Sequence, residues 1–145
     1  YNVRPLEMSG AIGSVQLKKW PEIMKTRIDN AQFFVAMFGN KPWCRIQKII
    51  GDSSWFTFGM VLDGELKGRR TEVVKALDEA GIQNRPLASR NFLKQPVMRD
   101  LDFIDNKDYT SADDIHDNGF FVGNGSLAIT DQINKLYEVI SKFTK

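Results

Sequence analysis

The sequence predicts a two-layer α/β domain preceded by a helical arm. Apolar residues recur at helical spacing along the first 38 residues. From residue 44 onward, short runs with a period of two alternate with helical stretches, and glycine or proline marks most boundaries. The length, 145 residues, is that of one ordinary domain. We therefore expect a helical arm and linker over residues 1–40 and a small domain with a mixed sheet over residues 41–145.

The arm is expected to contain two helices. The first spans residues 6–19 and ends at Pro21, because the residue before a proline avoids helical backbone angles. The second spans residues 22–38, and Gly39 and Asn40 are expected to end it in the left-handed conformation. The apolar stripe of the second helix comprises Ile23, Met24, Ile28, Ala31, Phe34, Val35 and Phe38.

Two strands come next, over residues 44–49 and 54–62. The second strand is the clearer one, because alternate residues form one fully apolar face, which favours a sheet covered by helices on that side. That face comprises Phe56, Phe58, Met60 and Leu62, whereas Trp55 falls on the other face.

The rest of the domain alternates between helices and short strands. Thr71 is expected to cap a helix that stops at Gly81. Residues 87–109 read as a long loop, and connections of this length in a compact domain tend to be functional. The other predicted elements are a strand over residues 82–85, a helix over 110–116, a strand over 120–122 and a last helix that Thr130 caps.

Composition excludes several classes of protein. Hydrophobic residues make up 42% and charged residues 26%, the balance of a soluble globular domain. No apolar run approaches the ~18 residues of a membrane span. The net charge is only +2, and basic residues are dense only at Lys18–Lys19 and Lys67–Arg70, so we expect neither a membrane nor a nucleic-acid partner.

Cysteine and histidine are each present once. The single Cys44 excludes an internal disulfide and a cysteine-based zinc cluster, and we expect it to be a buried strand residue in a protein of the reducing cytoplasm. The single His116 cannot build a histidine-rich metal site and is expected at the end of a short helix. The sequence therefore predicts no metal centre.

Three segments concentrate polar residues among glycines and prolines: residues 1–8, 82–96 and 116–124. The first opens Tyr-Asn-x-Arg and runs into a helix of the form Met-x-x-Ala-Ile-Gly-x-x-Gln-Leu. Its residues are Tyr1, Asn2, Arg4, Met8, Ala11, Ile12, Gly13, Gln16 and Leu17. No Walker loop, Rossmann glycine motif, zinc-protease motif or serine-hydrolase elbow occurs.

These segments resemble the C-terminal region of the DegT/StrS sugar aminotransferases. The first is similar to the segment that opens this region. The stretch from Arg85 to Pro96 resembles a branch that includes perosamine-type aminotransferases and 4-keto-6-deoxyhexose 3-dehydratases. The run from Phe120 to Asn124 is similar to the last strand of the family. The three matches occur in order and span essentially the whole chain.

The resemblance implies the C-terminal small domain of the fold-type I pyridoxal-phosphate (PLP) aminotransferase fold, with the arm taken from the end of the large PLP domain. It implies a homodimer that transfers an amino group from glutamate to a nucleotide-linked 4-keto sugar in surface-polysaccharide or other deoxyamino-sugar biosynthesis. The lysine that holds PLP and the aspartate against its ring nitrogen would lie upstream of Tyr1. We therefore expect the chain to be a piece of a longer protein, without a catalytic residue and inactive alone.

The resemblance also assigns individual residues. Asn2 matches an asparagine that reaches the PLP phosphate of the partner subunit, and Tyr1 and Arg4 flank it as further cofactor-binding candidates. Substrate-binding candidates are Arg85, Asn91, Gln95 and Asn124. An arginine at a strand end could bind a pyrophosphate or sugar hydroxyls bidentately. A surface salt bridge for Arg4 and a turn role for Asn124 remain open.

Two positions depart from the family pattern. Arg90 stands where the branch usually has a glycine, and Gly125 stands where it often has a histidine. Other readings also remain open. One is a PLP-dependent 4-keto-6-deoxyhexose 3-dehydratase of the same family, in which a histidine replaces the PLP lysine. A second is a stand-alone binding or regulatory α/β module, and a third is a basic nucleic-acid-binding domain.

Overall fold

A computed structural model describes residues 4–104 and 108–145 and shows a four-stranded sheet with helices. The elements are α1 (Glu7–Phe38), β1 (Cys44–Ile46), β2 (Thr57–Leu62), α2 (Arg70–Glu79), β3 (Asn84–Arg85), α3 (Thr110–Asn118), β4 (Gly119–Gly123) and α4 (Thr130–Ser141). The strand order is β1-β2-β4-β3. Every strand pair in the described part is antiparallel, so the expected mixed sheet is wrong. The reason is that the chain leaves the sheet after β3 and returns through α3 to insert β4 between β2 and β3.

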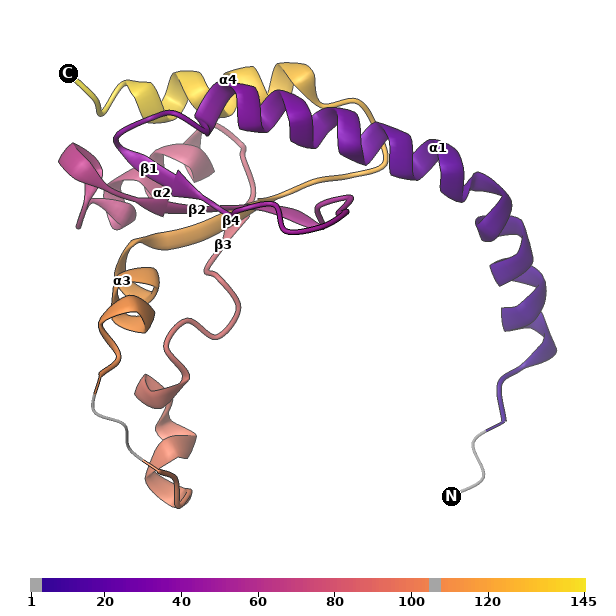
Figure 1. The fold of residues 1–145 in the computed structure, drawn as a ribbon, viewed down its shortest axis with the longest axis horizontal. Helices are drawn as coiled ribbons and strands as arrows, with labels where there is room; N and C mark the ends of the chain where they lie inside the picture. The colour runs from indigo at the N-terminus through magenta and orange to yellow at the C-terminus, as the bar shows by residue number, and fades with distance from the viewer. Residues whose placement is uncertain (1–3, 105–107) are drawn as a thin grey trace.

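The hydrophobic core lies between one face of the sheet and helices α1, α2 and α4. Figure 1 shows α1 and α4 running along the same side of the sheet, whereas α3 lies beyond the opposite side. The ring of Phe34 stacks on that of Phe58 at 4.4 Å, and the ring of Phe38 stacks on Phe34 at 4.7 Å. Cys44 is buried on β1 as expected, and burial raises the pKa of its thiol to about 12.

The arm is one helix rather than two. Helix α1 continues through Pro21, so the predicted break is wrong. An internal proline removes one backbone hydrogen bond and bends a helix, but it does not end a helix that packing supports on the C-terminal side. That side is anchored because residues 30–38 enter the core, while the first turns of α1 are exposed (Figure 1). The backbone of Gly39 has right-handed helical angles, with φ −60°, so the predicted left-handed end of the helix is also wrong.

Strand β2 begins later than expected, at Thr57, and the two aromatic residues before it lie on the opposite sides from those predicted. Phe58, Met60 and Leu62 are fully buried, as predicted. Trp55 is 2% exposed and Phe56 is 80% exposed, the reverse of the prediction. The cause is the φ of +47° at Trp55, which breaks the strand alternation before residue 57.

Other boundaries differ from the prediction by a few residues. Strand β1 covers three residues and β3 two. Helix α2 begins at Arg70 and α4 at Thr130, so neither Thr71 nor Thr130 is a cap. Gly81 follows α2 with φ +74°, in agreement with the predicted stop. The predicted loop contains two 3₁₀ helices, Phe92–Lys94 and Pro96–Asp100.

Candidate substrate-binding face

The sheet face opposite the core carries the strand-end arginine. Arg85 of β3 pairs with Phe121 of β4, which pairs with Gly59 of β2. Paired residues on neighbouring strands point to the same face, so Arg85 and Phe121 lie on the face away from Phe58. Leu87 lies against part of this face, because a Cβ atom on Gly59 would stand 3.3 Å from Leu87 Cδ2. The Arg85 end of the face is open to solvent.

The guanidinium of Arg85 is exposed and makes no hydrogen bond or ion pair with another described residue. It lines a hollow of about 340 Å³ together with Phe56, Phe121 and Asn124. A free guanidinium offers five N–H donors in a planar fork that matches phosphate oxygens. Two of the four predicted substrate residues, Arg85 and Asn124, therefore border one hollow, and Arg85 has its donors available.

Asn124 uses its side chain inside the fold. Its Nδ2 donates to the carbonyl oxygen of Arg27 at 3.1 Å and to that of Trp55 at 2.9 Å. Its Oδ1 accepts from Nδ2 of Asn30 at 3.2 Å, and the residue is only 6% exposed. These bonds join α1, the turn before β2 and the end of β4. They give Asn124 a structural role, and its predicted contact with substrate stays a prediction.

The long loop after β3 is tied to α3 by Asn91. The backbone N–H of Asn91 donates to Nδ1 of His116 at 3.3 Å, and its Nδ2 donates to Oδ1 of Asp113 at 2.8 Å. Gln95 Nε2 donates to the carbonyl oxygen of Ser89 at 2.9 Å, within the same loop. Asn91 is 6% exposed. The predicted substrate contacts of Asn91 and Gln95 are therefore not tested by this arrangement and stay predictions.

Charge around this loop is balanced by local pairs. Lys94 Nζ lies 2.7 Å from Asp113 Oδ1. The hydrogen bond from Lys94, followed by that from Asn91, holds the pKa of Asp113 below its usual value, and the pKa of Lys94 is raised by the same bond to Asp113. Burial, followed by the positive charge of Arg90, lowers the pKa of Arg70. Lys94 of the loop thus forms an ion pair with Asp113 of α3, whereas Arg90 of the loop repels Arg70 of α2.

Arg90 is held in a backbone conformation that suits glycine. Its φ is +60°, in the left-handed region that side chains with a Cβ atom rarely adopt. The family pattern has glycine at this position, so the structure supplies the physical reason for that glycine. The departure at Arg90 therefore introduces strain into the loop beside the candidate face.

Arg4 is the one cofactor-binding candidate among the described residues. Tyr1 and Asn2 lie outside the described residues. Arg4 is exposed just before α1 and makes no ion pair with another described residue, and both its predicted role and its salt-bridge alternative stay predictions. Figure 1 shows this end of α1 far along the arm from the sheet. Of the three candidates the described part holds Arg4 alone, so it does not form a PLP pocket by itself.

One functional candidate and two supporting residues escaped the sequence analysis. Phe56 was assigned to the core, and the interactions of Arg27 and Asn30 were not recognised. A signal existed for Arg27 and Asn30, because each lies four residues before a buried residue of the stripe, Ala31 and Phe34. Polar side chains in register with an apolar stripe need buried partners.

Larger hollows of about 930 and 770 Å³ flank α1, but they bring none of the predicted site residues together. The described residues contain no group of three or more His, Cys, Asp or Glu side chains that could hold a metal ion. Over the same residues, no helix is long and apolar enough to cross a membrane.

Comparison with protein families places this arrangement in a known group. Residues 1–141 match the model of the DegT/DnrJ/EryC1/StrS aminotransferase family. The chain belongs to this family. Two curated relatives share 43% and 40% of aligned residues over 98% and 97% of the chain. They are the GDP-4-keto-6-deoxy-D-mannose 3-dehydratases of Yersinia pseudotuberculosis and Escherichia coli O55:H7, and the chain spans 36% of the length of each.

Solved structures agree with this assignment. An E. coli GDP-4-keto-6-deoxy-D-mannose 3-dehydratase with bound hydrated PLP superposes with a TM-score of 0.88, at 41% identity over 96% of the chain and 36% of that structure. An aminotransferase of pseudoaminic acid biosynthesis from Helicobacter pylori gives 0.81 at 18% identity over 99% of the chain and 38% of that structure. The second likeness shows the fold alone. Together they confirm the small domain of fold-type I PLP enzymes with a preceding helical arm.

Proposed function

We propose that the chain is the small-domain part of a PLP-dependent enzyme that removes the 3-hydroxyl group of a GDP-linked 4-keto-6-deoxyhexose. Relatives at 43% and 40% identity that carry the 3-dehydratase name match nearly the whole chain. The aminotransferase from H. pylori is 18% identical and supports only the fold. Dehydration, which the sequence analysis kept as the alternative to amination, is therefore the better-supported reaction.

The observation that carries substrate recognition in this proposal is the exposed guanidinium of Arg85, which has no partner among the described residues. Arg85 is placed by the pairing of β3 with β4, so its backbone position is fixed by the sheet. A charged donor on a rigid element suits recognition of a charged group such as a diphosphate. In this proposal Arg85 binds the diphosphate of the nucleotide sugar, and Asn91 and Gln95 are weaker candidates on the neighbouring loop.

The remaining parts of the proposal concern the longer protein. PLP would be held mainly by a large domain outside this chain. Glutamate would supply the amino group that the cofactor carries and, by its oxidation to 2-oxoglutarate, the two electrons that replacement of the hydroxyl group by hydrogen requires, and the nitrogen would leave as ammonia. Asn2 would reach the PLP phosphate of the partner subunit in a homodimer, flanked by Tyr1 and Arg4. A further relative, 28% identical, is a Salmonella typhimurium lipopolysaccharide biosynthesis protein, which supports a role in surface-polysaccharide synthesis. A cytoplasmic location stays part of the proposal. The isolated chain would be inactive.

The test is product analysis with the longer polypeptide. The protein, loaded with PLP and supplied with L-glutamate, is incubated with GDP-4-keto-6-deoxy-D-mannose, and the product is analysed by mass spectrometry. We expect a sugar that has lost the oxygen at C3 and has gained no nitrogen. A product with nitrogen at C4 would show that the enzyme aminates the sugar instead of dehydrating it. A protein that binds no PLP would contradict both reactions.

A further inference from the structure

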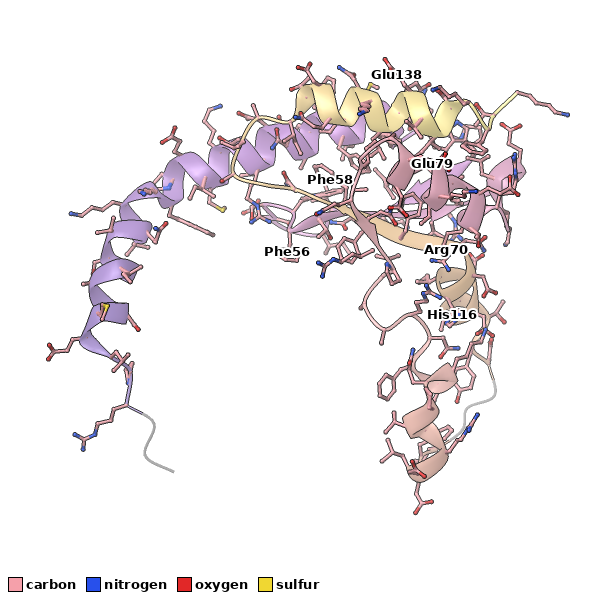
Figure 2. All side chains as sticks on the ribbon, turned by 180° about the vertical axis from the view of Figure 1, so that it is seen from behind. Phe56, Phe58, Arg70, Glu79, His116 and Glu138 are labelled. Carbon is pink, nitrogen blue, oxygen red and sulfur yellow. The ribbon has the colours of Figure 1, made fainter. Side chains whose placement is uncertain are left out.

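Phe56 is exposed in a place where its neighbours are buried. Its side chain is 80% exposed, whereas Trp55 is 2% exposed and Phe58 is fully buried. Figure 2 shows Phe58 between the sheet and the helices and Phe56 on the opposite side of the sheet. A phenylalanine on a surface exposes a large apolar area to water, which is unfavourable unless a partner covers it.

Side chains from two distant segments hold Phe56 in this position. Arg27 donates from Nε to the carbonyl oxygen of Ser54 at 3.2 Å and from Nη2 to that of Trp55 at 2.7 Å. Asn124 donates to the same Trp55 oxygen at 2.9 Å. Backbone strain such as the φ of +47° at Trp55 persists only where surrounding groups fix it. These hydrogen bonds therefore fix Phe56 in its exposed position.

The ring of Phe56 has one occupied face and shares a hollow with Arg85. The guanidinium carbon of Arg27 lies over the ring, 5.8 Å from its centroid. Phe56 and Arg85 both line the hollow of about 340 Å³ on the open sheet face. One cavity is thus bordered by an aromatic ring that a cation holds and by a guanidinium that has no partner among the described residues. Aromatic stacking recognises a planar base, and a guanidinium recognises phosphate.

We propose that Phe56 is the platform on which the nucleobase of the nucleotide sugar stacks while Arg85 binds its diphosphate. The inference rests on the proposed function, because it assigns a contact within that substrate site. The network of Arg27, Asn30 and Asn124 serves as the positioning device: it sets the turn that carries Phe56 relative to the strand end that carries Arg85. Asn124 thus acts on substrate binding through Phe56 and needs no contact with the ligand.

The test measures GDP binding to the PLP-loaded longer protein by calorimetry, with inorganic pyrophosphate as a second probe. Phe56→Ala should raise the Kd for GDP about 5- to 150-fold, the loss expected for one stacked base, and leave the Kd for pyrophosphate unchanged. Phe56→Trp should keep GDP binding close to that of the wild type, because indole also stacks. Phe103→Ala, which removes a phenylalanine that is 49% exposed outside this hollow, is the matched control. Unchanged thermal unfolding of Phe56→Ala would confirm that the variant folds.

Three outcomes would contradict the inference. An unchanged Kd for GDP in Phe56→Ala would overturn the inference but not the proposed function, provided that the wild type binds GDP and converts the nucleotide sugar. A weaker binding of GDP-4-keto-6-deoxy-D-mannose without a change for GDP would show that the ring faces the sugar, which also overturns the nucleobase assignment. A wild-type protein that neither binds GDP nor acts on the nucleotide sugar would overturn the proposed function together with the inference.

Discussion

Asn30 and Asn124 are joined by a buried hydrogen bond between their side-chain amides, at 3.2 Å and 94 positions apart in the chain. Asn30 also donates to the carbonyl oxygen of Leu127 at 2.8 Å and accepts from the N–H of Ile129 at 3.2 Å. The pair therefore holds the segment that leads into α4 against the anchored half of α1. No buried polar side-chain atom of the described residues lacks a partner, so this network is fully satisfied.

Removing one member should leave buried groups with fewer hydrogen bonds. Asn124→Ala deprives the carbonyl oxygens of Arg27 and Trp55 of a donor and the Asn30 amide of an acceptor. We expect a loss of about 2–3 kcal/mol in the free energy of unfolding, measured by urea denaturation of this chain. The control is Asn40→Ala at an exposed position, where the change should stay within about 0.5 kcal/mol. Equal effects of the two substitutions would refute a structural role for the network.

Arg90→Gly should stabilise the chain. Glycine removes the strain of φ +60° and the repulsion with Arg70, and these gains exceed the extra flexibility of glycine in the unfolded state. We expect an increase of up to about 1 kcal/mol in the free energy of unfolding. Arg90→Ala separates the two causes, because it removes the charge and keeps the strain. A destabilised Arg90→Gly would mean that the arginine side chain makes a favourable contribution larger than the strain.

Gly119→Ala should disturb the junction between α3 and β4. A Cβ atom there would stand 2.4 Å from the carbonyl oxygen of Ile115 and 2.7 Å from Leu87 Cδ1. We expect a loss of about 1–3 kcal/mol, measured by thermal or urea unfolding. Gly123→Ala, in the same strand with nothing within 4 Å of the added atom, is the control and should cost much less. Similar losses for both variants would show that the close approach of Leu87 is not the cause.

Stability should fall at acid pH through Asp113 and Asp114. Burial raises the pKa of Asp114, but hydrogen bonds from Lys67 and Arg45 outweigh it, so the pKa lies below its usual value. Asp113 is shifted in the same direction by Lys94 and Asn91. A carboxyl group with a lowered pKa in the folded state stabilises the fold above its ordinary pKa of about 3.9, and this stabilisation is lost as the pH falls through the folded-state pKa.

The measurement compares urea midpoints at pH 7 and pH 3. Asp114→Asn should lower the midpoint at pH 7 and reduce the difference between the two pH values, because the asparagine cannot titrate. Asp131→Asn, at an exposed position outside these ion pairs, serves as the control. If the difference between pH 7 and pH 3 were the same in Asp114→Asn as in the wild type, Asp114 would not contribute to acid sensitivity.

The sequence predicted the layers of the fold because those depend on local periodicity. The stripe that contains Phe34 and Phe38 and the alternation of Phe58, Met60 and Leu62 are visible in the sequence and form the core. Trp55 and Phe56 could not be placed in this way. Their exchange of faces depends on hydrogen bonds from Arg27 and Asn124, which lie 28 and 69 positions from Trp55.

The candidate site was predicted only in part, because its geometry depends on contacts between residues that lie far apart in the sequence. Arg85 was identified as a strand-end residue on the basis of the family resemblance, and the sheet register places it on the open face. The continuation of α1 through Pro21 could not be predicted, because it depends on tertiary anchoring of residues 30–38. The hollow beside Phe56 likewise exists only once three separated segments have met.

The most direct test of the substrate-binding face is the affinity of Arg85 variants for GDP-4-keto-6-deoxy-D-mannose in the PLP-loaded longer protein. We expect Arg85→Ala to raise the Kd about 10- to 150-fold, because a charged donor to the diphosphate contributes about 1.5–3 kcal/mol. Arg85→Lys should recover only part of the affinity, since an ammonium group cannot bind phosphate oxygens as a planar fork. A Kd for Arg85→Ala equal to that of the wild type would show that this face does not bind the nucleotide sugar.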